Sequence, residues 1–598
     1  MNTRHAAVRG SSLFRRGAVR TAFAAVLLAA LSACTTIRSG IERQAAERND
    51  IIYLTLMWHQ HQPLYYKDPE TGLYTRPWVR VHGTKDYLDM VEILERYPDL
   101  RVTYNLTPVL LTQLADLTAG AKDNYRARSE KPAAALTTEE RWFILERFFD
   151  ANRNNVIRRF PRYAELLELR GDGSPESIER ALSVFTERDY RDLQLWFNLA
   201  WIDPDYLAEQ PLSALVEKGR DFTERDKAVL FDEIDRILSR IVPAHRRLQD
   251  AGRIEVTTTP YAHPILPLLY STNLAEKGDP SVVKPDWFSY PNDAIAHLRK
   301  SVELYRDLFG REPRGLWPAE GAVAEEIVRL VADAGFSWMA SGEHVLAVSL
   351  GIGSFSRDET DTVIEADALY RPYIATGENG EKVAVMFRDV RLSDLIGFEY
   401  SGTPAEQAAA DFMARLESIR QKLKADGKPG PHLVSVILDG ENAWEHYPND
   451  GKAFLDALYR ALSESETVRT ITPSAYLSAY PEQRELETLH RGAWFSPDYA
   501  TWIGEEEENL AWNYLGRTRR ALSSYDMTGR KQTTPERLER AAEAMYFAEG
   551  SDWFWWYGTD QDSGNDEYFD EAFRALLAEV YIALDEPVPE FVKVPIIP

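Results

Sequence analysis

The chain has 598 residues and a formal net charge of −25. This length is too great for one minimal hydrophobic core, so we expect at least two structural units or one large barrel with insertions. The acidic balance argues against nucleic acid as a partner, because no basic stripe is available to displace counterions from a phosphate backbone. The 15 Trp and 29 Tyr residues supply many flat rings, which suit a sugar-binding protein.

The first residues have the pattern of an export signal. Five arginines precede the apolar stretch 21–30, which is too short to span a bilayer. The stretch leads into Leu31-Ser32-Ala33-Cys34, which resembles the cleavage box of bacterial lipoproteins. We therefore expect a signal peptide over 1–33, a lipid on Cys34 and a polar tether over 34–49. The protein would then be exported and anchored to a membrane, on the periplasmic face or the cell surface. In a Gram-negative cell we expect the outer membrane.

From residue 50 onward, short β-type runs alternate with helical stretches, as in β/α folds that form a barrel or an open sheet. Several runs are almost continuously apolar, which is typical of buried parallel strands. The predicted strands are 51–57, 101–105, 254–258, 337–340, 383–387 and 433–438. A helix is predicted over 322–334, where apolar residues recur at helical spacing.

Two regions interrupt this alternation. Residues 138–250 have helical periodicity and few strand signals, so we interpret them as a helical insertion at about these positions. After residue 473 the chain turns helical again. The predicted organisation is a β/α unit over 50–473 that contains the insertion, followed by an α-helical domain over 474–598.

Polar clusters follow three of the β-type runs. They are His59-Gln60-His61-Gln62-Pro63, Pro318-Ala319-Glu320 and Asp439-Gly440-Glu441-Asn442. In parallel β/α folds the carboxyl ends of the strands gather on one face, where sites are built. We therefore expect the three clusters to converge.

Glu320 and Asp439 are candidates for cleavage of an acetal. That reaction needs a proton for the leaving oxygen and a group that stabilises or traps the cationic carbon, and two carboxyls supply both. One must be ionised and the other protonated, so we expect environments that separate their pKa values. Aromatic residues adjoin both, with Trp317 before Glu320 and Trp444 after Asp439. Alternatively, Glu320 complements the N-terminus of the next helix and Asp439 is part of an ordinary turn.

His59 and His61 point the same way if their segment is extended. They could hydrogen-bond sugar hydroxyls, bind a metal, or be turn residues satisfied by the backbone. The sequence has no Asp at the usual spacing from this pair to complete a metal site. We therefore expect no metal and no cofactor.

Five segments occur in the order of the sequence regions of glycoside hydrolase family 57, and the chain resembles this family over roughly residues 50 to 585. The segments are HQP (61–63), GRIEV (252–256), GLWPAE (315–320), LDGENAWE (438–445) and SDWFWWYG (551–558). Within the family the chain is similar to the amylopullulanase branch. That likeness lies in RPWVRVH (76–82), PYAHP (260–264), LSDLIGF (392–398) and WIGE (502–505).

The resemblance implies a distorted seven-stranded β/α barrel, a helical domain after it, and a retaining mechanism on α-glucans. At matched positions it makes Glu320 the nucleophile and Asp439 the general acid/base. It also implies that His59, His61 and Glu255 line the donor subsite and that Asp552 and Trp555 complete it. Trp317, Trp444 and His263 lie in the same motifs and are further candidates for substrate binding.

Several functions fit these residues. The first is a hydrolase that cuts α-1,4 links in starch, glycogen or pullulan, with α-1,6 links as an open alternative. A 4-α-glucanotransferase or branching enzyme would use the same covalent intermediate. Two other classes are a metal-dependent enzyme with His59 and His61 as ligands and a surface glucan-binding protein that has lost catalysis. The oligomeric state stays open.

Overall fold

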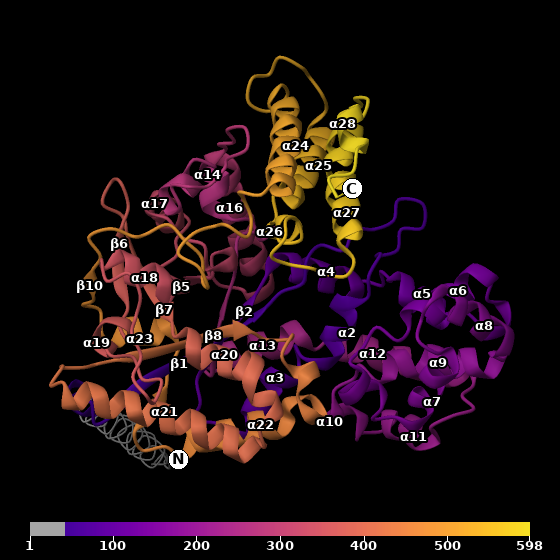
Figure 1. Ribbon diagram of the computed structural model, residues 1–598, viewed down its shortest axis with the longest axis horizontal. Coiled ribbons are helices and arrows are strands. Elements are labelled where there is room, and N and C mark those ends of the chain that lie inside the picture. The colour runs from indigo at the N-terminus through magenta and orange to yellow at the C-terminus, as the bar shows by residue number, and fades with distance from the viewer. Residues whose placement is uncertain (1–41, 598) are drawn as a thin grey trace, which may run out of the picture.

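A computed structural model describes residues 42–597 and is shown in Figure 1. Strands surrounded by helices occupy one half of the molecule, a group of helices extends to one side, and the last helices stand together above. The predicted signal peptide and Cys34 lie outside the described residues.

The first sheet is parallel, and the carboxyl ends of two of its strands carry predicted polar clusters. Its strand order is β3-β2-β1-β8, and β9 also pairs with β1. The strands are β1 (Ile52–Gln60), β2 (Val102–Leu106), β3 (Ile254–Thr257), β8 (Leu433–Asp439) and β9 (Val468–Thr470). Every residue of β1 and β2 is buried, as expected for strands covered on both faces.

The second sheet has the order β10-β6-β7-β5-β4, with β6 and β7 antiparallel and the other pairs parallel. Its strands are β4 (Gly315–Leu316), β5 (Trp338–Gly342), β6 (Tyr373–Thr376), β7 (Lys382–Arg388) and β10 (Arg484–Glu485). The two sheets touch through a parallel bridge between Thr258 and Leu316 and through Asp389, whose N–H donates to the Ser435 carbonyl at 2.8 Å. The α/β architecture is confirmed. The hydrogen bonds divide the strands into two sheets, so closure into one seven-stranded barrel stays a prediction.

Apolar side chains from both sheets meet between them. Met57 on β1 and Ile437 on β8 belong to the same buried cluster as Trp338 on β5 and Met386 on β7. Burial of this apolar surface, at roughly 25 cal/mol per Å², holds the sheets together and fixes the strand ends relative to one another.

Residues 138–250 form helices, as the periodicity predicts. They are α6 (Thr138–Arg147), α7 (Pro161–Arg170), α8 (Pro175–Val184), α9 (Glu187–Leu199), α10 (Pro204–Leu207), α11 (Leu212–Lys218), α12 (Glu224–Leu238) and α13 (Ile241–Asp250). Three of them, α6, α9 and α12, begin with a capping box in which a threonine and an acidic residue three positions later satisfy each other's backbone N–H. These boxes define where the helices start.

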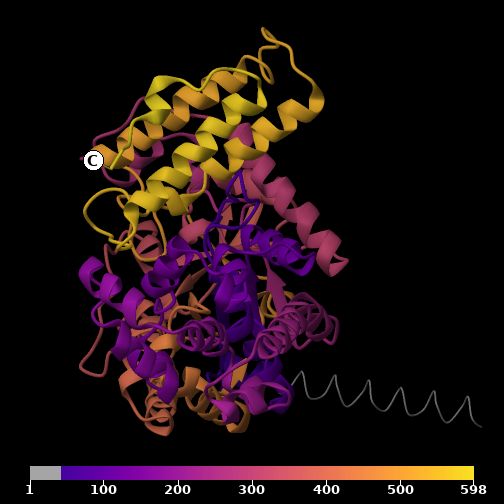
Figure 2. The same ribbon diagram turned by 90° about the vertical axis from the view of Figure 1, so that its right-hand side faces the viewer.

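The C-terminal helices are α24 (Glu506–Ser523), α25 (Pro535–Ala548), α26 (Ser551–Phe554), α27 (Asp566–Ala583) and α28 (Glu590–Lys593). Figure 2 shows α24, α25 and α27 side by side as one layer above the strands. The segment before them departs from the predicted helical domain over 474–598. After α23 (Pro473–Ala479) and β10, the described chain has no further helix until Glu506. Instead this segment packs on the loop before α17 (Glu325–Asp333), where Gly492 forms an antiparallel bridge with Val323.

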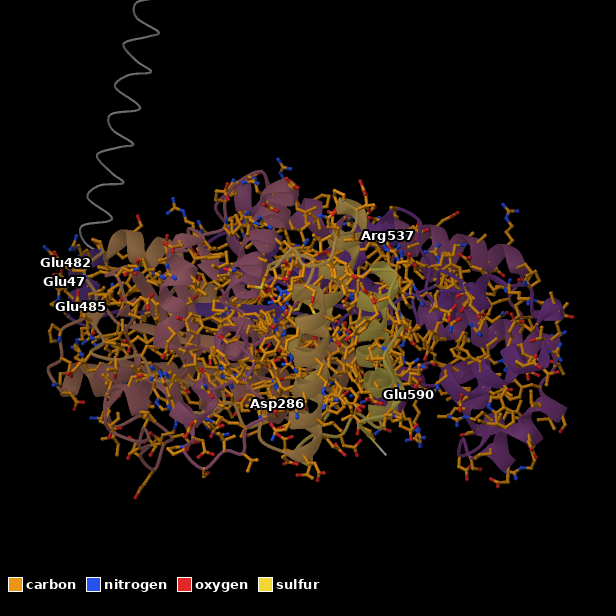
Figure 3. The ribbon with its side chains drawn as sticks, turned by 90° about the horizontal axis from the view of Figure 1, so that it is seen from above. Glu47, Asp286, Glu482, Glu485, Arg537 and Glu590 are labelled. Atoms are coloured by element: carbon orange, nitrogen blue, oxygen red, sulfur yellow. The ribbon has the colours of Figure 1, made fainter. Side chains whose placement is uncertain are left out.

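The end of the predicted tether is folded. Residues 42–47 are helical, and Asn49 is buried. Asn49 Nδ2 donates to the Lys428 carbonyl at 2.6 Å, and Asn49 Oδ1 lies 2.7 Å from His432 Nδ1. Figure 3 shows Glu47 at the same end of the molecule as Glu482 and Glu485. Polar contacts therefore dock residues 42–49, the end of the predicted tether, on the folded domain, and a tether over the residues before them stays a prediction.

None of the helices within residues 42–597 combines the length and the apolar character needed to cross a bilayer.

Candidate active site

Neighbouring strands of the first sheet place polar side chains in one layer. His59 on β1 pairs with Asn105 on β2 and with Asp439 on β8. Asn105 in turn pairs with Thr257 on β3. His59 Nδ1 donates to Asn105 Oδ1 at 2.6 Å, and Asn105 Nδ2 donates to Thr257 Oγ1 at 3.2 Å. The register of the sheet therefore orients His59 and sets Asp439 beside it.

Glu320 follows β4 of the second sheet and has a left-handed backbone, with φ of 57°. His263, in the loop after β3, has a φ of 59°. Non-glycine residues seldom adopt this region, and such strain collects at functional sites. The two residues are close, with His263 Nδ1 3.8 Å from Glu320 Oε1. Trp494 holds the Glu320 turn in place, because its N–H donates to the Glu320 carbonyl at 3.0 Å.

Helix α26 brings Ser551 and Asp552 to the strand ends. Ser551 Oγ accepts a hydrogen bond from His263 Nδ1 at 2.9 Å and donates to Glu320 Oε1 at 3.4 Å. Asp552 Oδ1 accepts from His61 Nε2 at 2.7 Å. The C-terminal helices thus complete a site that the strands begin.

Three histidine rings lie together in this site. His61 and His263 stack with ring centroids 3.9 Å apart, and His59 lies 5.7 and 5.4 Å from them. Burial, followed by the charge of His61, lowers the pKa of His59 to about 3. Burial likewise lowers the pKa of His263 well below its usual range, and the other two histidines add to the effect. Both rings are therefore neutral near pH 7, and because Nδ1 of each donates within the protein, its Nε2 is an acceptor that suits a sugar hydroxyl.

The two candidate carboxyls both favour their neutral forms. Burial raises the pKa of Glu320 well above its usual value, and the charges of Asp552 and Asp439 raise it further. Burial also raises the pKa of Asp439, against the opposing effect of the Asn442 amide, whose Nδ2 donates to Asp439 Oδ2 at 3.3 Å. The sequence led us to expect environments that move the two pKa values apart. In this structure both rise, because both carboxyls are desolvated, and their repulsion favours one proton shared by the pair.

His61, His263 and Asp552 could in principle hold a metal, since their ligand atoms lie within 4.8 Å of one another. Their arrangement fits one poorly. An imidazole binds zinc in its ring plane at about 2.0–2.1 Å. The rings of His61 and His263 are inclined by only 20°, so their lone pairs run nearly parallel and do not converge. His61 Nε2 is also engaged by Asp552. The geometry thus favours a hydrogen-bonded cluster over a metal centre.

Two further predicted substrate-binding residues, Trp317 and Trp555, differ in their burial and in their neighbours. Trp317 is fully buried and lies below His59, with ring centroids 5.9 Å apart. Trp555 is partly buried and packs against Phe495 and Trp502, each with its centroid 5.8 Å away. Trp317 therefore adjoins the histidine cluster, and the contacts of Trp555 are with aromatic residues outside that cluster.

Two predicted substrate-binding residues are corrected. Trp444 is 1% exposed and packs on Trp58, while its Nε1 donates to the Gly440 carbonyl at 2.9 Å. Its ring faces the core behind the Asp439 turn. Glu255 lies two residues before Thr257 on β3, where its carboxylate accepts from Trp338 Nε1 at 3.1 Å and from the Ser474 N–H at 3.0 Å. It joins the sheets below the site and does not reach the histidine cluster.

A sequence model of glycosyl hydrolase family 57 matches residues 55–488, well over half of the chain. The chain belongs to this family. A curated relative, a 1,4-alpha-glucan branching enzyme of Thermococcus kodakarensis, is 21% identical over 456 residues, which cover 67% of this chain and 61% of that enzyme. The family-57 chain thus matches less than two thirds of the relative's length.

Solved structures show the same fold. The branching enzyme of Pyrococcus horikoshii is 17% identical, with a TM-score of 0.56 and 89% of each chain covered. The α-amylase AmyC of Thermotoga maritima is 15% identical, with a TM-score of 0.55, and the match covers 91% of this chain and 95% of that one. These likenesses support a family-57 α/β fold with a large helical content.

Three residues of the family-57 site, Ser551, Trp494 and Arg388, were not identified from the sequence, whereas Glu441 belongs to a polar cluster that was expected there. Ser551 links His263 to Glu320, and Glu441 Oε1 accepts the His61 N–H at 3.0 Å. Trp494 packs its ring on Trp317 at 5.3 Å, and the Arg388 guanidinium lies 4.7 Å from the centroid of the Trp494 ring. Ser551 lies inside a matched motif and could have been considered. Trp494 and Arg388 lie outside those motifs, and only the three-dimensional structure brings them to the site.

Proposed function

We propose that this family-57 chain cleaves α-glucans by a retaining double displacement, with Glu320 as nucleophile and Asp439 as general acid/base. One observation carries this proposal. The two carboxyls come from the strand ends of different sheets, yet each lies beside the same cluster of histidines, and the charge of Asp439 raises the pKa of Glu320. A buried, interacting carboxyl pair is what glycoside cleavage requires.

In the first step the Glu320 carboxylate attacks the anomeric carbon, the bond to the glycosidic oxygen breaks, and Asp439 protonates that oxygen. In the second step Asp439 takes the proton of an acceptor hydroxyl, whose oxygen displaces Glu320 and restores the original configuration. The raised pKa of Asp439 keeps its proton available for the first step. Glu320 must be ionised at the same time. A pair that holds one proton can place it on Asp439 or on Glu320, and the first of these two states is the reactive one.

We propose a second glucan chain as the acceptor, so that the net reaction is transfer of the branching type. Relatives of this chain named as branching enzymes support this choice at the level of sequence and of fold. Hydrolysis is the second candidate, since an α-amylase shares the fold over nearly its whole length. Hydrolysis of the amylopullulanase type, which the sequence motifs favour, stays a prediction.

Product analysis on amylose tests the two outcomes. Transfer leaves the number of reducing ends unchanged and yields α-1,6 signals in the proton NMR spectrum, whereas hydrolysis raises the number of reducing ends. Retention requires that a linkage formed by transfer has the α configuration and that a reducing end formed by hydrolysis first appears as the α-anomer, and a β product in either case would contradict it.

Replacement of the two carboxyls tests the catalytic roles. Asp439→Asn should lower kcat by about 10²–10⁴-fold, and Glu320→Gln by at least as much, with the fold intact by circular dichroism. Normal turnover by either variant would overturn the assignment.

We further propose that Cys34 is lipidated and anchors the exported enzyme in a membrane. The motif at 31–34 supports this proposal. In a bacterial host, the wild type should incorporate labelled palmitate and partition into detergent, and Cys34→Ala should do neither.

A further inference from the structure

A cavity of about 710 Å³ lies where several distant parts of the chain meet. The loop after β1 contributes Tyr66 and Arg76, the insertion contributes Arg147, and α27 contributes Tyr568 and Glu571. Its volume is within the usual range of ligand sites, about 300–1,000 Å³. None of its lining residues belongs to the histidine and carboxyl cluster.

Two tyrosine rings and one arginine give this cavity its character. The Tyr66 and Tyr568 rings are stacked, with centroids 6.0 Å apart and planes inclined by 16°. The Arg76 guanidinium lies 3.7 Å from the centroid of the Tyr568 ring. Arg76 forms no ion pair with any residue of 42–597, and apart from Nη1, which donates to the Thr75 carbonyl at 3.4 Å, its guanidinium donors remain available to a ligand. The Tyr568 hydroxyl is fixed by Thr75 Oγ1 at 2.6 Å.

The lining charges nearly balance. Two arginines, Arg76 and Arg147, face three acids, Asp566, Glu567 and Glu571, and two amide side chains complete the wall. A phosphate-bearing or polycationic ligand would meet repulsion from one of these groups. Flat rings combined with amides, carboxylates and guanidinium donors suit a neutral ligand with many hydroxyls, such as a sugar chain.

Tyr65 connects this cavity to the catalytic site. Its neighbour Tyr66 lines the cavity, while the Tyr65 ring is buried and its hydroxyl donates to Gln62 Oε1 at 2.8 Å, next to His61. The segment 61–66 therefore runs from the histidine cluster, where His61 Nε2 donates to Asp552, to the wall of the cavity.

We propose that the cavity formed by Tyr66, Arg76, Arg147, Tyr568 and Glu571 binds glucose units of an α-glucan that lie several positions from the cleaved bond. This inference rests on the proposed function. It predicts that the cavity contributes to the binding of long chains and contributes nothing to short ones.

The test uses the full-length Glu320→Gln protein as parent, so that bound oligosaccharide is not consumed. Calorimetry compares maltoheptaose with maltotriose. Adding Tyr66→Ala should weaken maltoheptaose binding by about three- to tenfold, as expected for one lost ring contact, and leave maltotriose unchanged. Tyr525→Ala is the matched control, because Tyr525 is also a partly exposed ring beside a cation, Lys531, but lies outside the cavity.

A second variant tests the cavity without removing a ring that could contribute to folding. Glu571 is exposed and takes part in no ion pair within residues 42–597, so Glu571→Trp should fill the cavity without removing a buried contact. It should weaken maltoheptaose binding as Tyr66→Ala does. Unchanged maltoheptaose affinity in both variants would overturn the cavity proposal while the proposed function stands. If the parent binds neither oligosaccharide, the proposed function fails and the cavity proposal fails with it.

Discussion

Asp552 supplies one of the two charges that, after burial, raise the pKa of Glu320. Asp552→Asn keeps the shape of the side chain and removes that charge. Less repulsion then opposes ionisation of Glu320, so its pKa falls. Because the ionised form attacks, the acidic limb of the kcat/KM profile should move to lower pH. The profile on a maltooligosaccharide measures this shift.

The height of the same profile should also fall, because the amide binds His61 less strongly than the carboxylate does. Asp562→Asn, at an exposed position of the loop before α27, is the control and should leave both the limb and the height unchanged. An acidic limb that stays in place or moves to higher pH in Asp552→Asn would contradict this account of Glu320.

A substitution at Glu255 tests whether this residue joins the two sheets, as its contacts indicate, or lines the donor subsite, as the family resemblance implies. Its carboxylate accepts hydrogen bonds from Trp338 and Ser474, so Glu255→Gln should weaken buried contacts and lower the free energy of unfolding by about 1–3 kcal/mol. Because Glu255 does not reach the histidine cluster, kcat/KM should change less than threefold, measured beside denaturant unfolding. A large loss of activity in a protein of normal stability would restore its predicted role in the donor subsite.

The sequence could identify residues at strand ends but not the direction of every side chain. Position along the chain was enough to bring four residues together, because each lies at the end of a strand or a few residues after it. They are Glu320, Asp439, His59 and His61. Trp444 comes just after Asp439, yet its ring turns back onto Trp58, and nothing in the sequence separates those two orientations.

At the level of elements, the six predicted strands were found because each contains a run of β-type residues, and the runs of β1, β2 and β8 are almost continuously apolar. Strands β6, β9 and β10 have two to four residues, and no periodic pattern in the sequence marks them as strands. Their pairing depends on neighbours far along the chain. For the same reason the division into two sheets could not be predicted.

The end of β5 offers a test of how elements hold the site. A Cβ at Gly342 would lie 2.1 Å from the Trp494 carbonyl oxygen, so Gly342→Ala must displace the segment that contains Trp494. That segment holds the Glu320 turn through the Trp494 N–H. We expect a loss of about 1–3 kcal/mol in stability and at least about a tenfold loss in kcat, since small displacements at a reacting group are costly.

Gly402→Ala is the matched control, because no atom lies within 4 Å of a Cβ placed there. Thermal melting and kcat are measured for both variants. If Gly342→Ala keeps full activity, the Trp494 segment does not position Glu320.

At the scale of the whole molecule, buried charges tie the insertion to the strand-bearing part. Lys452 begins α22 (Lys452–Glu464), and its Nζ lies 2.8 Å from Asp89 Oδ2 and 2.7 Å from Asp203 Oδ2. Asp89 begins α3 (Asp89–Glu92), and Asp203 precedes α10 of the insertion. The three residues lie more than a hundred positions apart along the chain. The number of charged residues alone therefore could not predict that these three are buried together.

Lys452→Met should destabilise the protein by about 3–5 kcal/mol at pH 8, because it leaves two buried carboxylates without their cation. The loss should depend on pH in a defined direction. Burial raises the pKa of Asp89 to about 7 even with the opposing charge of Lys452, above its unfolded value of about 3.9. Between those values the folded state binds more protons than the unfolded state, so stability falls as pH rises. Without Lys452 the folded pKa rises further, and the window in which stability falls extends to higher pH.

At pH 5 the buried carboxyls of the variant are protonated, so the difference from the wild type should be small. At pH 8 their ionisation is opposed in the folded state and the difference should be large. Denaturant unfolding at the two pH values measures both. Lys531→Met, which removes an exposed lysine paired with Glu586, should leave the stability almost unchanged at either pH. An equal deficit for Lys452→Met at pH 5 and pH 8 would mean that Lys452 acts by packing, and that charge does not join the insertion to the strands.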